Sequence, residues 1–100
     1  PFYPIAVNLS ALQFENKKLF NVLEQLLEQY QIQPHNLILE ITESTAMHHI
    51  DSSIRTLERL RKLGIRIAID DFGTGYSSFL YLKDLPVDEL KIDRGFLIDL

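Results

Sequence analysis

Cysteine is absent from this sequence of 100 residues. Disulfides, thiolate metal sites and cysteine nucleophiles are therefore excluded within it, and the lack of disulfides fits a reducing cytosol. No apolar run approaches the roughly 18 residues of a membrane-spanning helix, so we expect no membrane contact by this segment. The net charge of −4 offers no basic face for DNA or RNA, although metal ions or helix N-termini could still bind smaller anions locally.

Short apolar runs alternate with amphipathic helical patterns along the chain, and such alternation predicts parallel strands in an α/β layer structure. The expected strands are residues 5–10, 37–42, 65–70 and 87–93, and the expected helices are residues 16–30, about 50–63 and about 78–84. The first two strand-to-strand intervals are about 30 residues, which is typical of βαβ units. A closed (β/α)₈ barrel needs about 250 residues, so the chain is expected to cover about half of one.

A polar side chain lies late in each expected strand, namely Asn8, Glu40, Asp70 and Lys91. Because side chains alternate across a strand, these four should converge at the carboxyl ends of the strands, where barrel enzymes carry their active sites. Amide and carboxylate oxygens, including that of neighbouring Asp71, suit Mg²⁺ or Mn²⁺ better than zinc. A lysine beside them can orient or deprotonate a water, or neutralise developing phosphate charge. The combination points to metal-assisted phosphodiester hydrolysis.

Each of these residues also has a structural explanation. An Asp or Asn at a strand end is commonly a turn former or a helix cap, which could account for Asn8 or for Asp70. Glu40 is harder to explain in this way, because an unpaired carboxylate within an apolar strand is costly. Its structural alternative is a buried ion pair with Lys91. Polar residues at matching places in four successive strands make a joint structural explanation weaker than any single one.

Two further signals are set aside. Residues 71–73 read Asp-Phe-Gly, like the metal-binding tripeptide of protein kinases, but no other kinase motif accompanies them. His48 and His49 are adjacent and cannot share one face of a regular element. Together with His35, they are expected to be surface residues rather than metal ligands.

Four motifs resemble the successive signatures of the EAL family of bacterial cyclic di-GMP phosphodiesterases. They are Val-Asn-Leu-Ser at 7–10, Leu-Glu-Ile-Thr-Glu-Ser at 39–44, Asp-Asp-Phe-Gly-Thr-Gly-Tyr-Ser-Ser at 70–78 and Leu-Lys-Ile-Asp-Arg at 90–94. Their order and spacing agree over essentially the whole chain. The resemblance implies a TIM-like barrel whose third to sixth strands lie here. Residues 1–100 would then be a partial EAL domain, truncated at both ends and inactive alone.

The resemblance also assigns roles to individual residues. It implies that Asn8 and Glu40 bind a first metal ion, that Asp70 bridges both ions and that Asp71 binds the second. Asp70 and Lys91 would be the catalytic residues, with Lys91 contacting the attacking water. The two ions would be Mg²⁺ or Mn²⁺.

A further implied role falls on Glu43, three residues after Glu40 and on the opposite face of the strand. It would anchor the loop of residues 71–78, which couples the site to homodimerisation in the family. The complete domain would hydrolyse cyclic di-GMP to linear pGpG in the cytoplasm, even if other domains anchor it to a membrane. The alternative is a degenerate EAL domain that acts as a non-catalytic receptor or protein-interaction module. The retained ligand set favours the enzyme, because a binding-only domain does not need two metal ions.

Overall fold

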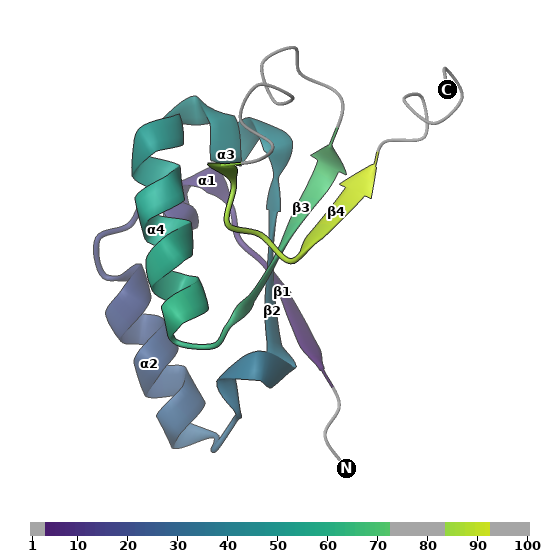
Figure 1. The fold of residues 1–100 in the computed structure, drawn as a ribbon. Coiled ribbons are helices and arrows are strands. Elements are labelled where there is room, and N and C mark those ends of the chain that lie inside the picture. The colour runs from purple at the N-terminus through teal and green to yellow at the C-terminus, as the bar shows by residue number, and fades with distance from the viewer. Residues whose placement is uncertain (1–3, 73–83, 93–100) are drawn as a thin grey trace.

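The structure is a computed structural model in which residues 4–72 and 84–92 are described. Within them one sheet contains the strands β1 (Ile5–Asn8), β2 (Leu37–Thr42), β3 (Arg66–Phe72) and β4 (Glu89–Ile92). The strands lie in chain order and every neighbouring pair is parallel. The helices gather on one side of this sheet (Figure 1). The predicted α/β layer structure is therefore confirmed for the described residues.

The helical elements connect successive strands. They are α1 (Ala11–Phe14), α2 (Leu19–Gln29), the 3₁₀ turn η1 (Pro34–Asn36), α3 (Glu43–His48) and α4 (Ile50–Lys62). The long helices α2 and α4 confirm the helices predicted over residues 16–30 and 50–63, whereas α1 and α3 were not predicted. Most of the helix predicted over residues 78–84 lies outside the described residues.

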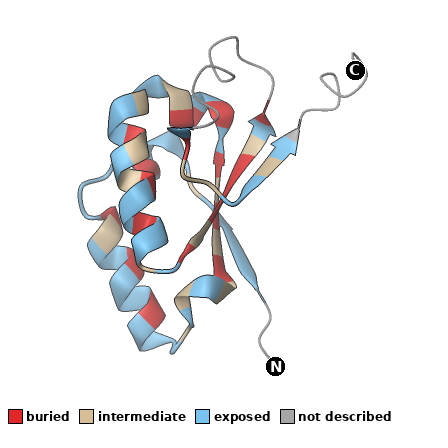
Figure 2. Ribbon diagram, in the orientation of Figure 1, coloured by how far each residue is buried: buried red, intermediate tan, exposed pale blue. Residues whose placement is uncertain are grey.

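Strand β2 shows why the sheet has one covered face. Leu37, Leu39 and Ile41 are 5%, 1% and 2% exposed, while the intervening Ile38 and Glu40 are only half-buried. This alternation places the three aliphatic residues against the helix layer and the others on the opposite face. Figure 2 shows the buried residues concentrated on β2 and β3 and along α2 and α4. Burial of this apolar face is the main force that holds the strands under the helices.

The end of α4 follows a Schellman arrangement. Gly64 has a φ of +99°. Its N–H donates to the carbonyl of Arg61 at 2.9 Å, and the N–H of Ile65 donates to the carbonyl of Leu60 at 3.3 Å. Glycine adopts this conformation without the steric penalty that a Cβ brings. A Cβ at this position would also lie 3.2 Å from Pro34 of η1. The predicted helix end at Gly64 is confirmed, and it turns the chain directly into β3.

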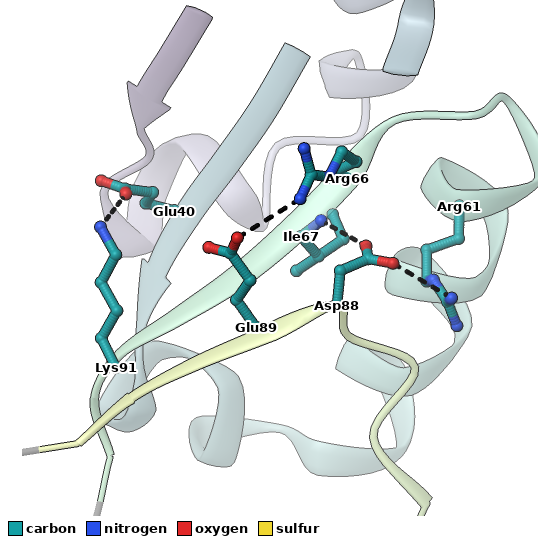
Figure 3. Close-up of polar contacts among 7 residues, drawn as sticks. All are labelled: Glu40, Arg61, Arg66, Ile67, Asp88, Glu89 and Lys91. Carbon is teal, nitrogen blue, oxygen red and sulfur yellow. Dashed lines mark hydrogen bonds and ion pairs between the residues drawn. The ribbon is translucent and has the colours of Figure 1, made fainter. Parts of the chain in front are cut away.

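Asp88 attaches the start of β4 to its neighbours. Its carboxylate accepts from the N–H of Ile67 at 2.7 Å and from Arg61 of α4 at 3.2 Å. Its own N–H donates to the carbonyl of Ile67 at 2.8 Å. These contacts set the position at which β4 begins, and with it the place of Lys91 further along the strand (Figure 3). In the part of the chain that is described, no helix has the length and apolar character to cross a bilayer.

Candidate active site at the carboxyl ends of the strands

Asn8 and Glu40 are direct partners in the register of β1 and β2. Glu40 is in turn the partner of Ala68 in β3, and Ala68 is the partner of Glu89 in β4. Partners in adjacent strands project to the same face of a sheet. Asn8 and Glu40 therefore share the face that carries no helices, near the carboxyl ends of their strands.

Lys91 reaches Glu40 across the intervening strand. Its Nζ donates to Oε2 of Glu40, although β4 and β2 are separated by β3 (Figure 3). The partner of Glu40 in β3 is Ala68, which is fully buried and is paired in turn with Glu89, two residues before Lys91. The Glu40 side chain is 12% exposed, whereas that of Lys91 is 49% exposed. The ion pair considered as a structural alternative is thus present, although its lysine is half-exposed rather than buried.

The environment of Lys91 favours its charged form. The hydrogen bond to Glu40 raises the pKa of Lys91, and the negative charges of Glu40, Asp70 and Glu89 act in the same direction against partial desolvation. Lys91 therefore carries an ammonium group at neutral pH. Such a group suits the orientation of a water or the neutralisation of phosphate charge, rather than removal of a proton from water.

A β-bulge brings both aspartates opposite Lys91. The register passes from Ile69–Leu90 directly to Phe72–Ile92, so two residues of β3 face one residue of β4. Those two residues are Asp70 and Asp71, and the one is Lys91. In a regular strand consecutive side chains point to opposite faces, and a bulge relaxes that rule and re-aims a side chain.

The backbone of Asp71 contributes to this bulge. Its φ is +54°, in the left-handed region that non-glycine residues seldom occupy. Asp and Asn are the residues that enter this region most readily after glycine. Asp71 is exposed and Asp70 is half-buried. The sequence placed Asp71 in a loop after the strand, whereas the structure keeps it within β3.

Glu43 is only 2% exposed and is the first residue of α3. β2 ends at Thr42, whose hydroxyl accepts from the N–H of Thr45 at 3.2 Å and caps the helix. The prediction that Glu43 lies on the opposite face of the strand is therefore wrong, because the strand has already become a helix. A carboxylate in the first turn of a helix is favoured by the helix dipole. The loop that it was predicted to anchor falls mainly on residues 73–78, outside the described residues.

A second polar pair lies on the same face but nearer the start of the strands. Arg66, the first residue of β3, donates to Glu89 at 3.3 Å (Figure 3). Both side chains are more than 40% exposed, at 43% and 45%. Because charges at such exposure are well solvated, this pair contributes little to stability.

The donor types at the carboxyl ends fit a hard divalent cation. The amide oxygen of Asn8 and the carboxylates of Glu40, Asp70 and Asp71 are oxygen ligands of the kind that Mg²⁺ and Mn²⁺ prefer. No histidine or thiolate belongs to this set. The residues present are therefore compatible with the expected metal ions.

Parallel strands in chain order with helices on one face are the arrangement of consecutive βα units in a (β/α)₈ barrel. The fold therefore defines a segment of an α/β barrel, with acidic, amide and lysine side chains at the carboxyl ends of its strands. The family model of the EAL domain matches residues 1–100. The chain therefore belongs to the EAL domain family, and it forms part of that family's TIM-like barrel.

Known relatives support this assignment. The chain is 57% identical over 96 residues to the bifunctional diguanylate cyclase/cyclic di-GMP phosphodiesterase MucR of Pseudomonas aeruginosa, covering 96% of this chain and 14% of that protein. It is 43% identical over 97 residues to the cyclic di-GMP phosphodiesterase PdeF of Escherichia coli, covering 97% of this chain and 13% of that protein. The chain thus spans about one seventh of the length of these relatives.

A solved structure agrees in fold as well as in sequence. The PaMucR phosphodiesterase in complex with c-di-GMP matches with a TM-score of 0.87 and 56% identity, covering 96% of this chain and 39% of that one. The arrangement of strands and helices described above is thus that of a portion of an EAL domain.

Proposed function

We propose that the complete domain hydrolyses cyclic di-GMP to linear pGpG and depends on Mg²⁺ or Mn²⁺. The observation that carries the proposal is the bond from the ammonium group of Lys91 to Glu40, whose strand lies between those of the oxygen donors Asn8 and Asp70. The relatives named as cyclic di-GMP phosphodiesterases supply the substrate. In the reaction one P–O bond forms with the oxygen of a water and one P–O ester bond of the ring breaks.

The proposed ligand roles follow the register of the strands. Asn8 and Glu40, which are partners in adjacent strands, would hold one ion, and Asp70 would contact both. Asp71 would hold the second ion. The bulge would allow the consecutive carboxylates of Asp70 and Asp71 to reach the same ion. When bound, the ions would increase the acidity of a water and offset the charge of the phosphate.

Lys91 would act as a fixed positive charge. Its hydrogen bond to Glu40 holds the ammonium group on the helix-free face, close to the residues assigned to the metal ions. From there it can donate a hydrogen bond to the attacking water or to a phosphate oxygen. A preorganised charge of this kind stabilises the transition state without reorganisation during the reaction.

Three further parts of the proposal concern regulation and location. Glu43 would hold the loop of residues 71–78 from its buried position at the start of α3. That loop would contribute to a homodimer interface and so link dimerisation to the active site. The protein would work in the cytoplasm, as expected for an enzyme of a bacterial second messenger.

A second candidate function is a non-catalytic receptor of cyclic di-GMP. The observation that favours it is the ion pair of Glu40 with Lys91, because a partly buried carboxylate that already has a cationic partner is explained without a metal ion. In such a receptor the pair would support the sheet, and the nucleotide would bind without cleavage.

The two candidates differ in what happens to the nucleotide. The full-length protein is incubated with cyclic di-GMP and Mg²⁺, and the nucleotides are separated by chromatography. Conversion to pGpG with multiple turnovers supports the enzyme. Binding of intact cyclic di-GMP, with no linear product under the same conditions, would contradict it and support the receptor. An Asp70→Asn variant of the same protein is the matched control for contaminating phosphodiesterases.

A further inference from the structure

Two histidines and a glutamate converge on the helical side of the molecule. Nδ1 of His48 and Nδ1 of His49 each lie 3.1 Å from the same oxygen, Oε1 of Glu15. The three ligand atoms lie within 4.8 Å of one another. The histidine side chains are 63% and 64% exposed and that of Glu15 is 40% exposed, so the cluster is open to solvent.

The convergence results from a break in the helix. His48 is the last residue of α3, and His49 has φ −136° and ψ +77°, which is outside the helical region. α4 begins at the next residue. Adjacent residues of a regular helix project in different directions, which is why the sequence argued against a joint ligand role. Because the backbone leaves the helical conformation between them, the two rings meet at 4.2 Å between centroids.

The cluster has the composition and spacing of a transition-metal site. With bonds of about 2.0–2.1 Å around a tetrahedral ion, neighbouring ligand atoms are about 3.3 Å apart. The two Oε1–Nδ1 distances of 3.1 Å are close to this value. Two imidazole nitrogens and one carboxylate oxygen suit Zn²⁺, Co²⁺, Ni²⁺ or Cu²⁺, in contrast to the all-oxygen set at the carboxyl ends of the strands.

The surroundings leave space for the remaining coordination position. Glu15 and His49 line a cavity of about 480 Å³ between the α1–α2 region and α4, together with Ser52 and Thr56. The cavity is also lined by the cationic side chains of Lys17 and Arg59. A site with three protein ligands completes its coordination with water or another small ligand.

We propose that Glu15, His48 and His49 form a binding site for a divalent transition-metal ion, for which Zn²⁺ is the probe. The ion would join α1, which follows β1, to α3 and α4, which follow β2. It would therefore cross-link Glu15 to His48 and His49, which lie 33 and 34 residues further along the sequence. Because such an ion binds only the folded arrangement, it would stabilise the connections that directly follow Asn8 and Thr42. The inference does not depend on the proposed phosphodiesterase activity.

The test is a calorimetric titration of the full-length protein with Zn²⁺ in the presence of saturating Mg²⁺. The double variant His48→Ala, His49→Ala should lose one equivalent of bound Zn²⁺ or bind it about 100-fold more weakly. Glu15→Gln should weaken the binding of the same equivalent of Zn²⁺. His35→Ala is the matched control, since His35 is an exposed histidine of η1 outside the cluster, and it should bind Zn²⁺ as the unchanged protein does.

A second readout separates binding from loss of structure. Without Zn²⁺ the exposed substitutions should leave the Tm of the protein nearly unchanged, and added Zn²⁺ should raise the Tm of the wild type more than that of the double variant. The visible spectrum of added Co²⁺ should show tetrahedral coordination only when His48 and His49 are present. Equal Zn²⁺ stoichiometry and affinity in the wild type and the folded double variant would overturn the proposal.

Discussion

Lys91 of β4 contacts Glu40 of β2 across the full width of β3. Lys91 lies two residues after Glu89, the residue that shares its row of the sheet with Ala68 and Glu40. Glu40 is largely shielded from water, so the ammonium group offsets the cost of placing a carboxylate there. One pairing thus holds a proposed metal ligand and a proposed catalytic cation on the same face of the sheet.

Replacing Lys91 by Met tests whether this cation acts in the reaction. The variant keeps much of the side-chain length but removes the charge, and turnover should fall by about 10²–10³-fold. The raised pKa of Lys91 implies that its charge persists well above neutral pH, so wild-type turnover should not decline near neutrality because of this group. Metal stoichiometry should be retained. If the pair is only structural, the variant should lose stability while the remaining folded protein turns over normally.

Asp70 and Asn8 should differ in importance. Because Asp70 is assigned to both metal ions and Asn8 to one, Asp70→Asn should lower turnover more than Asn8→Ala does. The comparison is made at saturating Mg²⁺ with the complete domain, and bound metal is counted in the same samples. Equal and mild losses for the two variants would show that Asp70 does not bridge the ions.

Glu43 should affect turnover without acting as a metal ligand. The isosteric Glu43→Gln variant avoids leaving a cavity at this buried position, which is 2% exposed. We expect reduced turnover with near-normal metal stoichiometry, measured by metal titration of the purified domain. Loss of one metal equivalent would refute the loop-anchoring role and make Glu43 a ligand.

Asp88 should contribute to stability more than its neighbour Glu89. Asp88 accepts from Arg61 and from the backbone of Ile67, so Asp88→Ala should lower the free energy of unfolding by about 1.5–3 kcal/mol. Glu89→Ala removes only the exposed pair with Arg66 and should cost about 0–1 kcal/mol. Urea unfolding of the complete domain compares the two. Equal effects would mean that Asp88 does not attach β4 to the sheet.

Much of the layer structure could be predicted from apolar periodicity. The predicted strand over residues 37–42 has the same bounds as β2, because its alternating Leu and Ile residues match a half-covered strand. The end of α4 was also predictable, since Gly64 adopts the positive φ that helix ends often require. In both places the local chemistry and the tertiary packing favour the same structure.

Other features depend on contacts that periodicity does not encode. α3 begins immediately after β2 with no intervening turn signal, so Glu43 was assigned to a strand face. The bulge at Asp70 and Asp71 is set by the pairing of β3 with β4, which are distant in sequence. The meeting of His48 with Glu15 likewise needs the packing of α1 near the α3–α4 junction. The geometry of both candidate sites therefore depends on tertiary contacts that the sequence pattern does not reveal.

The most direct test of the central claim is the dependence of cyclic di-GMP hydrolysis on metal ions. The full-length protein is assayed with Mg²⁺, then in excess chelator, and then after Mg²⁺ or Mn²⁺ is restored beyond the chelator. Because the site consists of amide and carboxylate oxygens, we predict that pGpG formation stops in chelator and returns with either ion. Full activity that persists in excess chelator would contradict the account.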